Sequence, residues 1–251
     1  MNINWDAEKY TKNFSFVHQY GEGVLELIDI RDGMTVLDLG CGNGALTSRL
    51  NEMGANAFGM DSSHDLIEKA REKYPDIRFI EGDAVNYVLE SPVDAVFSNA
   101  VFHWIDKDKQ QDMLKCVFDS LKVGGQFVFE FGGYGNNYII HKSLEKAFTE
   151  HGLEYKMPFY FPTIGEYTSL MEKTGFKVVY AVLFDRMTEL SKEDGLYGWI
   201  DMFVKTPFEN ISGEKKDILI KQAVSYAKGE LYRNGIWYAD YVRIRCKAVK
   251  E

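Results

Sequence analysis

The chain has 251 residues, of which 45% are hydrophobic and 27% charged, a balance typical of a globular protein. Its net charge of −9 argues against a broad nucleic-acid surface, which would have to be basic. There is no apolar run of the roughly 18 residues that span a membrane, no signal-peptide pattern, and no disulfide or metal spacing among the cysteines and histidines. We expect a cytoplasmic monomer that binds neither nucleic acid nor membrane.

The first half of the chain alternates predicted strands with predicted helices. An amphipathic helix precedes residues 31–33, and a strand begins at Thr35. The following strands are predicted over 57–60, 77–80, 94–98 and 126–131, and the helices between them over 46–53, up to Tyr74, and 108–121. Such alternation implies right-handed crossovers and a parallel sheet.

The second half is less regular. Helices are predicted over 137–151 and 163–174, around 196–204 and around 214–228, and strands over 176–184 and 236–249. The helices around 190–235 interrupt the alternation before the final strand, a natural position for a cap over a ligand.

The run from Val36 to Leu46 is the most informative stretch, because a buried strand leads into a loop with glycines at alternate positions. Gly40, Gly42 and Ala45 fit a dinucleotide fingerprint on paper. Asp38 lies two residues before the first glycine and would repel an anionic pyrophosphate. The ammonium and sulfonium of S-adenosylmethionine would suit that carboxylate, and a purely structural turn is the remaining alternative.

Further polar groups follow the ends of later strands, where ligands bind in open α/β sheets. Asp61 comes 21 residues after Gly40, a spacing suited to accepting hydrogen bonds from a ribose. Asp83 and Ala84 follow the third strand and could meet an adenine; Asn99 and Ala100 follow the fourth. A helix cap at Asp61 and a turn at Asp83 are the alternatives without a ligand.

Together, the glycine loop, Asp61, Glu81-Gly82-Asp83-Ala84 and Leu121 to Gly125 resemble the motifs of class I S-adenosylmethionine-dependent methyltransferases. Trp5-Asp6, Tyr10 and Ser98 to Trp104 resemble the trans-aconitate methyltransferase-like (methyltransferase type 11) branch. The resemblance implies an α/β, Rossmann-like, doubly wound and mostly parallel seven-stranded sheet with a helical cap inserted in the C-terminal half.

The predicted units are an N-terminal lid and first helix (1–33), a cofactor-binding core (34–132), and the rest of the sheet with the cap (133–251). The resemblance implies in-line methyl transfer to a small molecule such as a small carboxylic acid, S-adenosylhomocysteine as product, and no metal. The expected cofactor ligands are Tyr10, Asp38, Gly40, Cys41, Gly42, Asp61, Ser62, Asp83, Ala84, Asn99, Ala100 and His103.

His103 is the candidate catalytic group, as a base, as a donor that orients a ligand, or as a loop residue without a chemical role. With His103 as base the enzyme could be a small-molecule N- or O-methyltransferase, and a non-catalytic cofactor-binding regulator is the alternative of another class. Predicted acceptor-pocket residues are Trp104, Tyr134, Trp199 and Tyr238. Arg186, Arg233, Arg243 and Arg245 are candidates for clamping an anion or for ion pairs within the sheet.

Overall fold

The computed structural model describes residues 21, 23–191 and 194–251. Its strands are β1 (Thr35–Leu39), β2 (Asn56–Asp61), β3 (Phe79–Glu81), β4 (Val93–Asn99), β5 (Leu121–Gly132), β6 (Phe176–Glu189), β7 (Tyr232–Arg233) and β8 (Ile236–Lys250). Seven of these described strands lie side by side in the order β3-β2-β1-β4-β5-β8-β6, and β7 pairs with β8. The first five are parallel, whereas β8 runs antiparallel between β5 and β6. The predicted α/β class with a mostly parallel sheet is confirmed.

Helices cover both faces of this sheet. The α-helices that lie wholly within the described residues are α3 (Ala45–Glu52), α4 (His64–Lys73), α5 (Gln110–Ser120), α6 (Tyr138–Glu150), α7 (Ile164–Thr174), α8 (Gly195–Phe203) and α9 (Gly213–Leu231). Along β1, Leu37 and Leu39 join the core under α5 and α7, while Val36 packs on the opposite face with Leu50 of α3. The alternation of side chains along a strand produces this split, and burial of both faces explains why the strands are so apolar.

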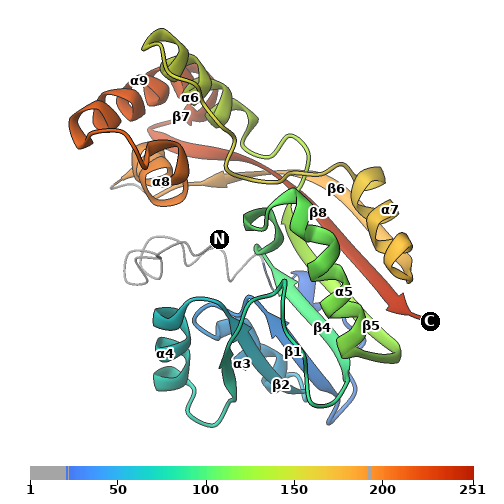
Figure 1. Cartoon of the computed structure of the whole chain (residues 1–251). Helices are drawn as coiled ribbons and strands as arrows, with labels where there is room; N and C mark the ends of the chain where they lie inside the picture. Colours follow the sequence, from blue (N-terminus) through green and yellow to red (C-terminus); the bar gives the residue numbers. More distant parts are fainter. Residues whose placement is uncertain (1–20, 22, 192–193) are drawn as a thin grey trace.

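A second hydrophobic core lies between α6, α8 and α9, built around residues such as Leu144, Ile200 and Leu219. Figure 1 shows these helices beyond one end of the sheet, where β6 and β8 run past the other strands. β6 reaches Glu189, which pairs with Tyr238 of β8, so the strand predicted over 176–184 is longer than expected. We call α6, α8 and α9 the helical layer.

Short 3-10 turns complete the chain at Phe102–Trp104, Lys107–Lys109 and Thr206–Phe208. Within the described ranges, the helices are too short or too polar to cross a lipid bilayer.

Candidate active site

The loop between β1 and α3 depends on glycines with left-handed backbones. Gly40, Gly42 and Gly44 have φ values of 77°, 54° and 79°, a region that side chains with a Cβ rarely occupy. A Cβ at Gly40 would lie 2.2 Å from Val101, whereas one at Gly42 would have no neighbour within 4 Å. The loop therefore packs tightly on one side and leaves open space above Gly42.

Asp61 links this loop by hydrogen bonds to the start of α4. Its Oδ2 accepts a hydrogen bond from the Gly42 amide at 2.9 Å, and its Oδ1 accepts one from the Ser63 amide at 2.9 Å. Burial raises the pKa of Asp61, and these amide bonds oppose that rise. Each carboxylate oxygen has a second lone pair, so Asp61 retains acceptor capacity for a ligand.

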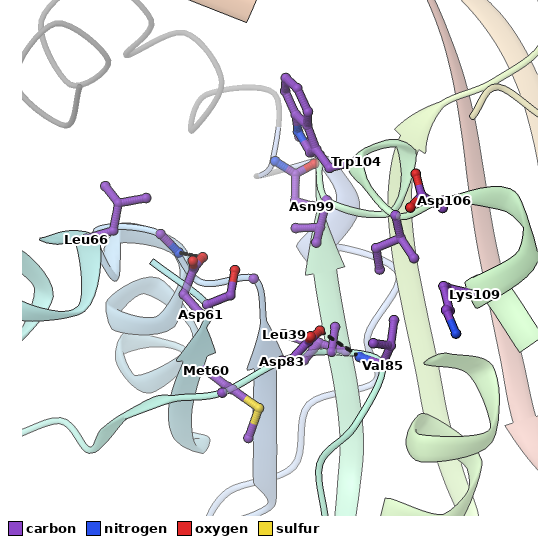
Figure 2. A pocket seen from close by; sticks show the side chains of 18 residues that line it. Leu39, Met60, Asp61, Leu66, Asp83, Val85, Asn99, Trp104, Asp106 and Lys109 are labelled. Carbon is purple, nitrogen blue, oxygen red and sulfur yellow. Dashed lines mark hydrogen bonds between the residues drawn. The ribbon is translucent and has the colours of Figure 1, made fainter. Parts of the chain in front are cut away.

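A cavity of about 170 Å³ opens beside the loop, at the carboxyl ends of the parallel strands. Figure 2 shows Asp61 and Asp83 below Asn99 and Trp104 in the view. Eight predicted cofactor ligands line it: Gly40, Gly42, Asp61, Ser62, Asp83, Ala84, Asn99 and Ala100. The structure adds residues that sequence reasoning missed, among them Leu66, Val101 and Lys109, whose types carry no signal until the fold brings them together. We call this the first cavity.

Two predicted cofactor ligands in the described chain lie beneath the loop and do not line this cavity. The Asp38 carboxylate, only 2% exposed, accepts a hydrogen bond from Thr47 Oγ1 at 2.6 Å. Burial raises the pKa of Asp38 to about 7, which weakens the charge that the sequence argument assigned to it. Cys41 is buried, and its Sγ would lie only 2.6 Å from a Cβ placed on Gly59. Tyr10 lies outside the described residues.

A smaller cavity of about 60 Å³ adjoins the first, and Ala100 and Trp104 line both. Ala100 has φ of 62°, an uncommon backbone for a residue with a Cβ and a feature often found at functional sites. Trp104 and Trp199, two of the residues predicted for the acceptor pocket, line this second cavity. The other two residues predicted for that pocket line neither cavity: Tyr134 is 65% exposed, and Tyr238 pairs with Glu189 in the sheet.

His103 lines the second cavity and not the first. Its Nδ1 accepts a hydrogen bond from the Gly132 amide at 3.3 Å. Burial, aided by the positive charge of Arg243, lowers the pKa of His103 well below its usual range. The ring is therefore neutral, and its proton is on Nε2 because Nδ1 is the acceptor. This arrangement suits a hydrogen-bond donor better than a base.

Glu130, which sequence reasoning missed, forms ion pairs with three of the candidate arginines. Its buried carboxylate accepts from Arg186 at 2.7 and 3.0 Å, from Arg245 at 2.8 Å and from Arg243 at 3.4 Å. Arg233 lies on β7 and bonds the Glu230 carbonyl instead. A signal was present in the sequence: Glu130 is the one charge in the aromatic run Phe127 to Phe131, and buried charges need partners.

Arg243 also lines the second cavity, together with Asn136, Asn137 and aromatic rings from Phe159, Phe161, Phe203 and Tyr241. These residues come from the connection after β5, from the segment before α7, from the helical layer and from β8. The cavity is thus assembled from segments far apart in the sequence, which is why its lining could not be predicted as a set.

Comparison with known proteins agrees with this geometry. A family model described as a methyltransferase domain matches residues 36–125. An uncharacterized methyltransferase of Schizosaccharomyces pombe is 32% identical over 259 residues, covering 98% of this chain and 98% of the relative. A trans-aconitate 2-methyltransferase of Azoarcus sp. is 33% identical over 123 residues, 48% of either chain.

Among solved structures, Haemonchus contortus phosphoethanolamine N-methyltransferase 2, in complex with phosphomonomethylethanolamine and S-adenosylhomocysteine, shares the fold. Its TM-score is 0.58 at 20% identity, over 92% of this chain and 52% of that one. The full-length match to the yeast methyltransferase, the matching domain and the site at the strand ends lead to one conclusion: this chain belongs to the class I S-adenosylmethionine-dependent methyltransferases.

Proposed function

We propose that this enzyme transfers a methyl group from S-adenosylmethionine to a small carboxylic acid bound in the second cavity. The observation that carries the proposal is the contact between the two cavities: they share Ala100 and Trp104, and Arg243 lines the second one. A donor in the first cavity and an anion beside Arg243 would therefore be neighbours. The match to part of a trans-aconitate 2-methyltransferase adds support.

The first cavity suits the chemistry of S-adenosylmethionine. Asp61, with acceptor capacity left on both oxygens, would bind the ribose hydroxyls. The amide of Ala84 donates to no acceptor in the described chain, so it is available to an adenine nitrogen, with Asp83 beside it for the amino group. Asn99 and Ala100, at the end of β4, would meet the methionine arm.

The second cavity has the electrostatics of an anion site. Among the described residues, three guanidinium groups face the single carboxylate of Glu130, so the described part of this cluster carries more positive than negative charge. Arg243 contacts Glu130 through Nε, and no described protein atom accepts a hydrogen bond from its terminal nitrogens. A carboxylate in the cavity would supply the missing acceptor and pair in the bidentate manner that guanidinium groups favour.

When bound, S-adenosylmethionine supplies a methyl group on a sulfonium sulfur. A carboxylate oxygen of the acceptor would form the new bond to the methyl carbon as the carbon–sulfur bond breaks, and no proton moves. An ionised acid needs no base at neutral pH, which agrees with a neutral His103 acting as a donor. The residues of the chain would contribute mainly orientation, and orientation can be worth roughly 7–11 kcal/mol of a barrier.

We also propose that the units predicted from the sequence have separate roles, with residues 34–132 binding the cofactor and residues 133–251 binding the acceptor. Among the described residues, 34–132 supply all of the lining of the first cavity, and 133–251 supply most of the lining of the second. The helical layer, which contributes Trp199 and Phe203, would then act as the cap over the acceptor.

The test is methyl transfer from labelled S-adenosylmethionine to a panel of carboxylic acids that includes trans-aconitate. We expect the labelled methyl group to appear in a methyl ester of the acid. Alkaline hydrolysis of that ester should release the label as methanol. In Arg243→Gln, the KM for the acid should rise at least ten-fold, while affinity for S-adenosylhomocysteine stays unchanged. Arg233→Gln is the matched control, because Arg233 lies on exposed β7 outside both cavities. If S-adenosylhomocysteine binds but no acid accepts label, the carboxylic-acid assignment fails.

A further inference from the structure

Two polar side chains that line the second cavity have the donor or acceptor character of their free atoms set by backbone amides. His103 is one case: because the Gly132 amide donates to Nδ1, the nitrogen left over is Nε2–H, a donor. No described protein atom accepts from that nitrogen. The orientation of this ring is thus imposed by β5, not chosen by the ligand.

Asn136 is the second case, and sequence reasoning did not single it out. Its side chain is 4% exposed, and its Oδ1 accepts a hydrogen bond from the Val242 amide at 2.9 Å. This bond distinguishes the two ends of the carboxamide, which otherwise look alike. The NH₂ end is left facing the cavity, and it has no acceptor among the described residues.

Arg243 offers only donors. Two lining side chains carry acceptor oxygens: the Tyr241 hydroxyl accepts a hydrogen bond from Trp199 Nε1 at 2.7 Å, and Asn137 Oδ1 is buried. Ring side chains complete the walls; Phe159 and Phe161 stack at 5.4 Å, and Trp104 meets Phe159 edge-on at 4.8 Å. The cavity therefore combines apolar walls with donors from three lining side chains, His103, Asn136 and Arg243.

We propose that Asn136, fixed by the Val242 amide, acts with His103 and Arg243 as a specificity-determining donor set that accepts a carboxylate on an apolar body and rejects the matching amide. An amide has one acceptor oxygen where the carboxylate has two, and its NH₂ group would face a donor of the protein. Buried donors would then be left without an acceptor, and the cost of leaving them unpaired lets such a site reject the amide. The inference rests on the proposed function, because it takes the second cavity as the acceptor site.

The test compares acid and amide binding in protein saturated with S-adenosylhomocysteine. Calorimetric titrations would use benzoate against benzamide, phenylacetate against phenylacetamide, and crotonate against crotonamide. At least one acid should bind ten-fold or more tightly than its amide. Asn136→Asp keeps an oxygen for the Val242 amide but turns the cavity-facing donor into an acceptor, so it should remove that preference. Asn210→Asp, which adds the same charge at an exposed position, should retain it.

Equal binding of acids and amides to the wild-type protein, or no binding of any acid, would overturn the proposal without any variant. A purely structural role for Asn136 predicts that Asn136→Asp lowers the melting temperature yet keeps the acid-to-amide ratio, and that result would overturn it too. Acid-selective binding without methyl transfer would leave this inference standing and refute the proposed function. Titration with S-adenosylhomocysteine reports on the first cavity separately.

Discussion

Replacement of Asp61 by asparagine tests the link between the glycine loop and the cofactor. Asp61 uses both oxygens to hold the amides of Gly42 and Ser63 at 2.9 Å. An asparagine has one oxygen, so Asp61→Asn would leave one amide facing an NH₂ group and would remove the charged acceptor proposed for the ribose. A hydrogen bond to a charged group is worth about 1.5–3 kcal/mol, so the Kd for S-adenosylhomocysteine should rise roughly 10- to 150-fold.

The assay is calorimetric titration of S-adenosylhomocysteine into wild-type protein, Asp61→Asn and Asp76→Asn. Asp76 is an exposed carboxylate outside the first cavity, so its variant controls for the lost charge. Circular dichroism would show that each variant is folded. An unchanged Kd in folded Asp61→Asn would refute the reasoning, because it would mean that neither the held loop nor the carboxylate contributes to cofactor binding.

Three further substitutions test other parts of the structure. Asp38 has a folded-state pKa of about 7, above the unfolded value of about 3.9, so the folded protein binds more protons and loses stability as pH rises between those values. Asp38→Asn should be more stable than wild type at pH 8, by up to about 4 kcal/mol, with the gap closing toward pH 4 in urea titrations. Glu130→Gln leaves the buried Arg243 and the partly buried Arg186 and Arg245 without the Glu130 carboxylate and should cost about 3–5 kcal/mol. The arginines lower the pKa of Glu130 in the folded protein. The wild-type ion pairs therefore contribute their full stabilisation at pH values above the pKa of Glu130 in the unfolded chain. This stabilisation should be lost as the pH falls through the lower pKa of the folded state. Leu219 of α9 is fully buried, so Leu219→Ala should lower the free energy of unfolding by about 2–5 kcal/mol. Amide hydrogen exchange in the helical layer should become faster, while the affinity for S-adenosylhomocysteine stays unchanged.

Local chemistry in the sequence predicted most of the polar lining of the first cavity, which we propose as the cofactor site. The strand before Gly40, the three glycines and Asp61 lie within one short stretch, so their spacing alone predicts a strand, a tight loop and a carboxylate at the next strand end. Family membership decides the cofactor in favour of S-adenosylmethionine over a dinucleotide. The same local reasoning missed β7, although Asn234-Gly235, with φ values of 52° and 81°, is a strong hairpin signal.

What the sequence by itself determined was each element whose period and capping residues are close together along the chain: the parallel strands, the glycine loop and the helices of the C-terminal half. Only the tertiary structure decided that β8 runs antiparallel between β5 and β6, that Glu130 meets Arg243 across 113 positions, and that backbone amides orient His103 and Asn136. Periodicity reports the burial of one face of one segment. Register, charge pairing and hydrogen-bond polarity belong to pairs of segments, and those pairs exist only once the chain has folded.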